Sequence, residues 1–122
     1  MRESTLWFLQ LITGAIIFFL LMGHITLIHF YYSRILYLFG LGVIEPISFE
    51  EVVTRGRSAL IASMYVIFLA AALYHGLYGF RNIVFEVIES RPFQKAFSFF
   101  LILVGAVTFI YGAYVTIASL NL

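Results

Sequence analysis

The chain has 122 residues, of which 63% are hydrophobic and 11% are charged, and its net charge at pH 7 is +1. So few charged side chains cannot cover a soluble domain of this size, which indicates a small integral membrane protein. The near-zero net charge predicts no nucleic-acid partner. The absence of Cys excludes disulfides and iron–sulfur ligation by this chain.

Three long stretches contain no Asp, Glu, Lys or Arg: residues 4–33, 58–80 and 96–122. Each is long enough to cross a bilayer as a helix, which takes about 20 residues. Backbone groups in lipid must bond to one another, so only helices or a closed barrel can span, and three spans cannot close a barrel. We predict an all-α membrane protein, a single domain with transmembrane helices over about residues 5–32, 58–89 and 92–120.

The longest connection joins the first and second predicted helices. Its apolar part, residues 35–44, is expected to lie on the membrane surface or to cover a neighbouring subunit, and Pro46 ends it. Ser48 and Glu51 form a capping-box pattern, so a helix is expected to begin there and could continue through Gly56 into the second long helix. Pro92 suits the first turn of the third helix, which would make the second and third helices antiparallel neighbours.

The basic residues favour an N-terminus on the cytoplasmic side. With that orientation the inner side carries four cations and the outer side three, a small positive-inside bias. The inner set is Arg2, Arg81, Arg91 and Lys95, and the outer set is Arg34, Arg55 and Arg57.

All three histidines fall within the predicted spans, and two of them, His24 and His75, lie away from the span ends, where an ionisable side chain indicates function by default. His24 lies about 27 Å along its helix from Leu6, whereas His75 lies about 16 Å from Glu86 on the same side. The two histidines are thus expected at different depths, His24 in the outer half and His75 in the inner half. One haem between them would fit poorly, so the simpler arrangement is two haems, each taking its second axial ligand from another chain. The alternative for each is a neutral buried His that donates to a backbone carbonyl.

The neighbours of the two histidines differ. Ala71 and Gly79 lie one turn from His75 on its face of the helix, and small residues there would make room for a flat macrocycle. His24 is flanked by Leu20, Leu21 and Leu27, which favour neither alternative.

Other polar side chains lie close to the predicted boundaries. His29 is either an interfacial His or a donor to a haem propionate. Arg81 either extends to lipid phosphate or pairs with the propionate of the inner haem, or lines a quinone site. Tyr74 and Tyr78 could donate hydrogen bonds to haem or quinone, or be interfacial tyrosines. The carboxylates of Glu86 and Glu89 could relay protons, although solvation at a helix end explains them as well.

These residues also form a pattern that resembles the cytochrome b membrane anchor of succinate dehydrogenase and fumarate reductase, the complex II family. The resemblance covers the first two predicted helices, whereas the third matches only in length and character. It lies in Gln10-x-x-Thr13-Gly14 and Gly23-His24-x-x-x-x-His29-Phe30 of the first helix and Tyr74-His75-x-x-x-Gly79-x-Arg81 of the second.

The resemblance implies a cofactor arrangement. Some family members are single chains with five helices and two haems, in which the first-helix His binds the haem far from the soluble subunits and the second-helix His binds the near one. His24 and His75 match those positions. A chain with three helices and both histidines resembles one half of a two-subunit, two-haem anchor, and it would share two haems b with a second small membrane-anchor subunit.

The resemblance also implies partners and a role. The chain would be an electron-transfer subunit, without catalysis of its own, of succinate dehydrogenase, which links the tricarboxylic acid cycle to electron transport. A flavoprotein would oxidise succinate, and an iron–sulfur subunit on the inner face would pass electrons to a quinone. Two haems at two depths suit a low-potential quinone such as menaquinone. Such a chain is expected among the lipids of the cytoplasmic (inner) membrane of a prokaryote.

Two departures from the family weaken the assignment of the quinone site. Many anchors have Arg where this chain has Leu11, and the Tyr that follows the position of Glu86 is replaced by Val87. Two other functions stay open from sequence: a b-type cytochrome subunit of another quinone oxidoreductase, and a haem-free structural anchor.

Overall fold

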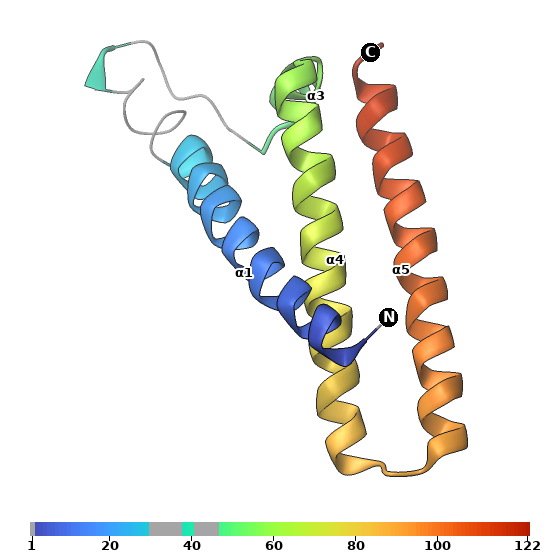
Figure 1. The fold of residues 1–122 in the computed structure, drawn as a ribbon. Coiled ribbons are helices and arrows are strands. Elements are labelled where there is room, and N and C mark those ends of the chain that lie inside the picture. Colours follow the sequence, from blue (N-terminus) through green and yellow to red (C-terminus); the bar gives the residue numbers. More distant parts are fainter. Residues whose placement is uncertain (1, 30–37, 41–46) are drawn as a thin grey trace.

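The computed structural model describes residues 2–29, 38–40 and 47–122, and this part of the chain is helical without strands. The helices are α1 (Glu3–Ile25), α3 (Phe49–Gly56), α4 (Ala59–Val87) and α5 (Arg91–Ser119) (Figure 1). Residues 26–29 continue α1 as a wider, π-helical turn. The predicted all-α fold with three long helices is confirmed. The predicted end of the first helix at residue 32 and most of the predicted surface segment, residues 35–44, lie outside the described residues.

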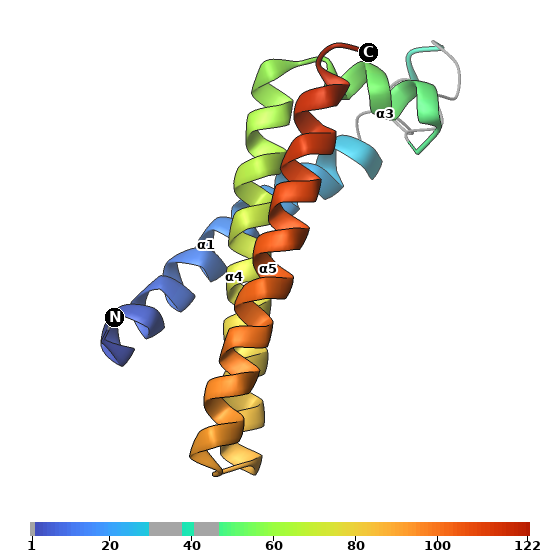
Figure 2. The same ribbon diagram turned by 90° about the vertical axis from the view of Figure 1, so that its right-hand side faces the viewer.

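Helix α4 occupies the centre of the molecule. Helix α1 packs on α4, α5 packs on α4, and in the described residues α1 and α5 do not pack on each other. Helix α5 runs antiparallel to α4, as predicted, whereas α1 crosses α4 at an incline (Figures 1 and 2). We call the end with the α4–α5 connection the turn end and the opposite end, where α3 packs on α4 and α5, the α3 end.

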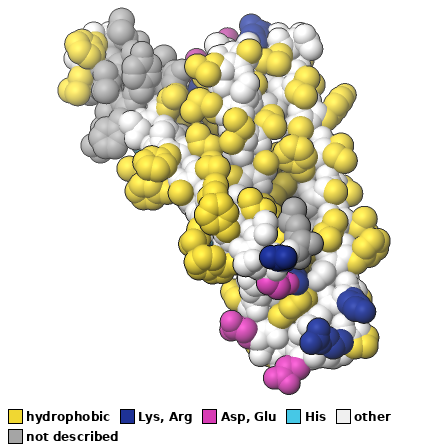
Figure 3. Space-filling model, viewed as in Figure 1, with side chains coloured by type: hydrophobic (Ala, Val, Ile, Leu, Met, Phe, Trp, Pro, Cys, Tyr) yellow, Lys and Arg dark blue, Asp and Glu magenta, His cyan; other side chains and the backbone are white. Residues whose placement is uncertain are grey.

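The three long helices are built to cross a membrane. They span Glu3–His29, Ala59–Val87 and Arg91–Ser119, with 27, 29 and 29 residues. At about 1.5 Å per residue each is about 40 Å long, more than the hydrocarbon core of about 30 Å. In the described residues only Ala62, Ala71, Tyr78 and Leu101 form a buried apolar core. The remaining apolar surface covers the middle of the helices, and charged side chains gather towards their ends (Figure 3), so the chain is an integral membrane protein.

Glycines on α5 bring α4 and α5 together. A Cβ added at Gly105 would lie 2.8 Å from Cδ1 of Leu77, and one added at Gly112 would overlap the side chain of Leu69. These leucines fill the space that the glycines leave, because small residues let transmembrane helices approach closely.

Two serines set the helix boundaries at the α3 end. The side chain of Ser48 accepts a hydrogen bond from the backbone N–H of Glu51 (3.4 Å), which confirms the predicted helix start. The prediction that this helix could continue through Gly56 into the second long helix is wrong. Helix α3 ends at Gly56, and Ser58 starts α4 by accepting from the N–H of Ile61 (3.5 Å).

Side chains also close the two ends of α5. The hydroxyl of Ser119 donates to the carbonyl of Gly56 (3.3 Å), which ties α5 to α3. At the turn end Pro92 lies in the first turn of α5, as predicted. The amide of Gln94 donates to the carbonyl of Ile88 (2.9 Å) and so satisfies a group left by the end of α4.

We predict that Gly112→Val destabilises the chain because the added side chain overlaps Leu69. Overpacking of this kind costs about 1–3 kcal/mol. Thermal unfolding in detergent micelles measures it. Gly76→Val is the matched control, because a Cβ at Gly76 meets nothing within 4 Å. Equal losses for the two variants would contradict close packing at Gly112.

Candidate functional site

His75 and Gln10 bind each other where α1 crosses α4. The Nδ1 atom of His75 lies 3.1 Å from the backbone carbonyl oxygen of Gln10. The side-chain amide of Gln10 donates to the carbonyl of His75, also at 3.1 Å. Gly14 makes room for the ring, since a Cβ there would lie 3.1 Å from Cε1 of His75. Two reciprocal hydrogen bonds therefore fix the imidazole against α1.

This contact sets the tautomer of His75. A carbonyl oxygen can only accept, so Nδ1 carries the proton and a neutral imidazole keeps a lone pair on Nε2. Among the described residues Nε2 has no hydrogen-bond partner, and the side chain of His75 is only partly buried. Haem-ligating histidines use one ring nitrogen in this way while the other donates to a fixed acceptor. The hydrogen bond to a backbone carbonyl, which was predicted for a buried His without a haem, is present at His75. It leaves Nε2 available to bind another group.

The role predicted for Gly79 is not what the structure shows. A Cβ at Gly79 would lie 3.2 Å from Nε2 of Gln10, so the space beside this glycine holds a side chain of α1. Gly79 admits α1 rather than leaving open room for a macrocycle. The Oε1 atom of Gln10 is buried next to it and has no hydrogen-bond partner among the described residues.

His24 contacts α4 near the α3 end. Its Nδ1 atom lies 3.3 Å from the hydroxyl of Tyr65, and the two rings meet edge to face with centroids 5.6 Å apart. The ring of Phe68 lies 6.4 Å away. A cavity of about 110 Å³ adjoins these three side chains. Unlike a carbonyl, a phenol can donate or accept, so the tautomer of His24 is not fixed by this bond.

The two histidines lie at different levels of the bundle. His24 pairs with Tyr65 in the first half of α4, whereas His75 lies further along the same helix, about 15 Å towards the turn end. The two histidines are thus separated along the bundle, in the sense that the helix counts predicted. In the described residues no group of three or more His, Cys, Asp or Glu could hold a metal ion.

Arg81 links the three long helices near the turn end. Its guanidinium pairs with Glu3 of α1 (3.4 Å), and its Nε donates to the hydroxyl of Ser98 of α5 (3.2 Å). The guanidinium carbon lies 4.4 Å from the ring centroid of Phe85. Only 21% of the side chain is exposed, so Arg81 is held between helices instead of extending into solvent.

Two stacked tyrosines of α4, Tyr74 and Tyr78, lie close in sequence to His75 and Arg81. The rings of Tyr74 and Tyr78 are 5.6 Å apart and nearly parallel, at 8°. Tyr74 donates to the carbonyl of Leu6 (2.8 Å), and Tyr78 donates to the carboxylate of Glu3 (3.3 Å). Both hydroxyls thus bind α1.

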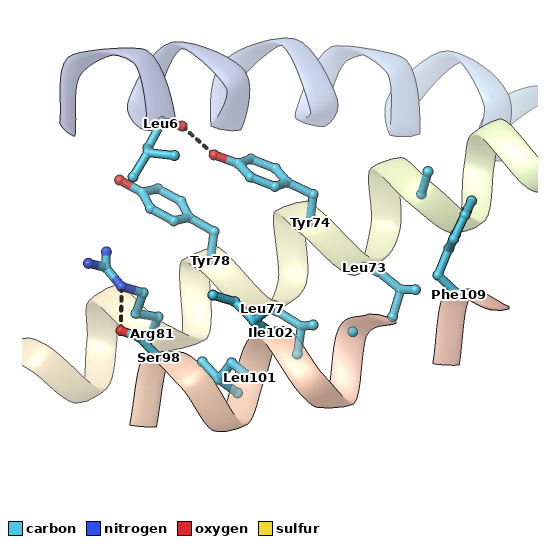
Figure 4. Close-up of a pocket in the computed structure, with 12 residues that line it drawn as sticks. Leu6, Leu73, Tyr74, Leu77, Tyr78, Arg81, Ser98, Leu101, Ile102 and Phe109 are labelled. Atoms are coloured by element: carbon cyan, nitrogen blue, oxygen red, sulfur yellow. Dashed lines mark hydrogen bonds between the residues drawn. The ribbon is translucent and has the colours of Figure 1, made fainter. Parts of the chain in front are cut away.

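A cavity of about 490 Å³ lies beside these residues, with walls from α1, α4 and α5 (Figure 4). This volume is in the range of small-molecule sites. Its polar residues are Tyr74, Tyr78, Arg81 and Ser98, and its apolar walls are Leu6, Ala70, Leu73, Leu77, Leu101, Ile102, Gly105 and Phe109.

The other predicted polar residues lie apart from this cavity. His29 is exposed at the end of α1, and Glu86 and Glu89 are exposed near the turn end. Sequence reasoning missed Glu3, Ser98 and Tyr65. Glu3 looked like an ordinary charge at a terminus, and a serine or tyrosine in an apolar run carries no signal of its own. One signal was present: Arg81 ends an uncharged stretch, and a cation at that position could have prompted a search for an acidic partner.

Comparison with known families decides what kind of chain this is. Residues 2–112 match the family of succinate dehydrogenase/fumarate reductase transmembrane subunits. The chain belongs to this family. The match includes all of α1, α3 and α4 and most of α5, so it extends beyond the two helices that carried the sequence resemblance. Searches of curated proteins and of solved structures gave no match.

We expect Arg81→Leu to destabilise the chain, because it removes the contacts that join α1, α4 and α5. Hydrogen bonds to charged groups contribute about 1.5–3 kcal/mol. The carboxylate of Glu3 is 72% exposed, so its pairing is weakened by salt, whereas the bond to Ser98 is not. Thermal unfolding at low and high salt should show a loss that largely persists at high salt. The control is Arg91→Leu at the exposed start of α5, and an equal effect there would contradict the prediction.

Proposed function

We propose that this chain is a cytochrome b anchor subunit of a succinate:quinone oxidoreductase. In this proposal it binds haem b together with a partner anchor chain and passes electrons from an iron–sulfur subunit to a membrane quinone. The supporting observation is the fixed tautomer of His75, which presents an Nε2 lone pair from a helix of a succinate dehydrogenase/fumarate reductase transmembrane subunit.

The residues present fit haem at two levels. His75 and His24 each have Nδ1 engaged by a neighbouring helix, and each side chain is only partly buried. A bound haem supplies one-electron transfer at its iron, and the protein sets its potential through the axial ligand and its hydrogen bonds. The stronger acceptor at His75, a backbone carbonyl, makes that imidazole the better electron donor to a metal.

His75 and His24 would each hold one haem from one side, so a second ligand for each haem would have to come from elsewhere. The chain has three histidines, and the remaining one, His29, is exposed at the end of α1. We infer a second small anchor subunit whose histidines complete both sites. The hydrogen bond from His29 to a propionate stays a prediction.

The large cavity is proposed to hold the quinone. A quinone is a flat apolar ring with two carbonyl oxygens, which need hydrogen-bond donors. The cavity offers apolar walls with Arg81, Ser98 and Tyr78 at one end. Arg81 would take the part of the arginine that the family often carries at the position of Leu11. Menaquinone is the expected quinone. The turn end would face the cytoplasm of a prokaryote, and the iron–sulfur and flavoprotein subunits would dock there.

We predict that the purified complex contains about two haems b per covalently bound flavin, and that each ligand variant loses one. His75→Ala should remove the inner haem and weaken assembly, because it also breaks the bond to Gln10. His24→Ala should remove only the outer haem. Pyridine haemochrome spectra and flavin fluorescence measure the ratio. His29→Ala is the control and should keep both haems.

The ratio of haem to flavin in the complex with the unaltered chain also distinguishes the other functions that the sequence left open. A complex without haem would indicate a structural anchor, and haem without flavin or succinate activity would indicate another quinone oxidoreductase. Unchanged haem in His75→Ala or His24→Ala would remove that residue as a ligand.

A second prediction concerns the cavity. Ile102→Trp should fill it and lower succinate–quinone activity at least about tenfold, a loss of about 1.4 kcal/mol of transition-state stabilisation. Succinate oxidation by a soluble dye should be retained, because the dye does not need the cavity. Ile110→Trp is the control: it changes the same residue type on the same helix, at an equally exposed position that does not line the cavity. Parental quinone activity in Ile102→Trp would contradict a quinone in this cavity.

A further inference from the structure

One carboxylate connects the polar end of the large cavity to water. Glu3 is 72% exposed, and its Oε2 accepts a hydrogen bond from the hydroxyl of Tyr78 at 3.3 Å. Tyr78 is only 9% exposed and lines the cavity. The exposed carboxylate and the buried phenol thus form a continuous hydrogen-bonded path from solvent to the wall of the cavity, in which both groups can carry a proton.

We propose that Glu3 and Tyr78 form the route by which protons pass between water and the quinone cavity. The inference rests on the proposed function, because it takes the occupant of the cavity to be a quinone. It gives a role to Glu3, near the start of α1. Glu3 is neither a proposed haem ligand nor one of the residues proposed to bind the quinone.

The chemistry of the step balances as follows. Reduction of a quinone to a quinol takes two electrons, supplied by the iron–sulfur subunit, and two protons, one on each carbonyl oxygen. The carbonyl oxygen that faces Tyr78 forms an O–H bond as the phenolic O–H breaks. The carboxylate of Glu3 then takes up a proton from water and passes it to the phenolate, which restores the phenol and the carboxylate. The second carbonyl oxygen takes its proton from water. Quinol oxidation runs through the same groups in reverse.

The charged and titratable groups around Glu3 support this assignment. Arg81 faces the carboxylate from α4 at 3.4 Å and holds it beside Tyr78, but a guanidinium does not release its proton and cannot carry one. Tyr74, stacked on Tyr78, donates to the carbonyl of Leu6 and not to Glu3. Ser98 of α5 binds Arg81. Among the described residues that contact Glu3 and line the cavity, Tyr78 is therefore the one that can carry a proton.

The test uses the complete complex with the variant Glu3→Gln, because the amide can still accept from Tyr78 but cannot carry a proton. We expect succinate–quinone activity to fall at least about tenfold. Dye-linked succinate oxidation and haem content should stay at parental levels, and the solvent deuterium isotope effect on quinone reduction should rise. Added formate, a small weak acid, should restore the rate in proportion to its concentration. A purely structural role for Glu3 would not respond to formate.

The matched control is Glu89→Gln, which removes another exposed carboxylate at the turn end and should retain the parental rate and isotope effect. Parental quinone kinetics in Glu3→Gln would overturn the proposal, and so would a loss that formate does not restore. If Glu3→Gln does not assemble, Tyr78→Phe decides, since it keeps the ring and removes only the hydroxyl. Its quinone reduction should also fall about tenfold, and parental kinetics would overturn the route.

Failure of the route is separable from failure of the proposed function. A photoreactive azidoquinone should label α4 and α5 residues of the cavity equally in the parent and in Glu3→Gln. Labelling together with parental kinetics in Glu3→Gln would leave the quinone site and remove the proton route. Absence of cavity labelling in the parent would remove the quinone site itself.

Discussion

The reciprocal hydrogen bonds between Gln10 and His75 are the constraint on which the rest of the structure depends. In hydrocarbon a side-chain amide or an imidazole has no water to bond, so each must find a partner inside the protein. Here each residue binds the backbone of the other, at 3.1 Å in both directions, and Gly14 and Gly79 allow the approach. The bonds fix where α1 crosses α4, and they also fix which nitrogen of His75 carries its proton. A contact that holds the fold thereby also leaves the Nε2 lone pair of His75 without a partner among the described residues.

The inclined crossing of α1 explains where the large cavity lies. Helix α1 packs on α4 but not on α5. Side chains must therefore bound the space between α1 and α5. Near the turn end Arg81 reaches Glu3 on one side and Ser98 on the other, and its charge is satisfied without leaving the bundle. The cavity has apolar walls from α4 and α5 and a polar end where the three helices are joined. Its polarity is thus a consequence of the contacts that hold α1 in place.

The fold could be predicted from the sequence further than the site could. Stretches without charge gave the long helices, and Ser48 and Pro92 gave two helix starts, because these signals are local. The start of the second long helix at about residue 58 was predicted, but the break before it was left open, because only the side chain of Ser58 accepting from Ile61 shows that α3 and α4 are separate helices. Helical spacing placed Gly79 on the face of His75 correctly, but it could not show that Gln10 would fill that space.

Contacts between distant residues account for the rest of what was missed. Glu3 and Arg81 are 78 positions apart, and Tyr65 and His24 are 41 apart. A sequence pattern tells which residues share a helix face but not which helix lies opposite.

The same geometry explains why this chain is not a closed bundle by itself. Three helices can bury a common core only if each packs on the other two, and here α1 and α5 are kept apart. Large apolar residues such as Phe19 and Ile102 remain exposed, and in a bilayer lipid covers such surface at little cost, so no hydrophobic force drives further closure. What lipid cannot supply is a partner for polar groups such as Nε2 of His75 or the buried Oε1 of Gln10, which have none among the described residues. Any specific association with another chain or a cofactor would therefore gain most at these polar points, and it would stabilise the chain by mass action.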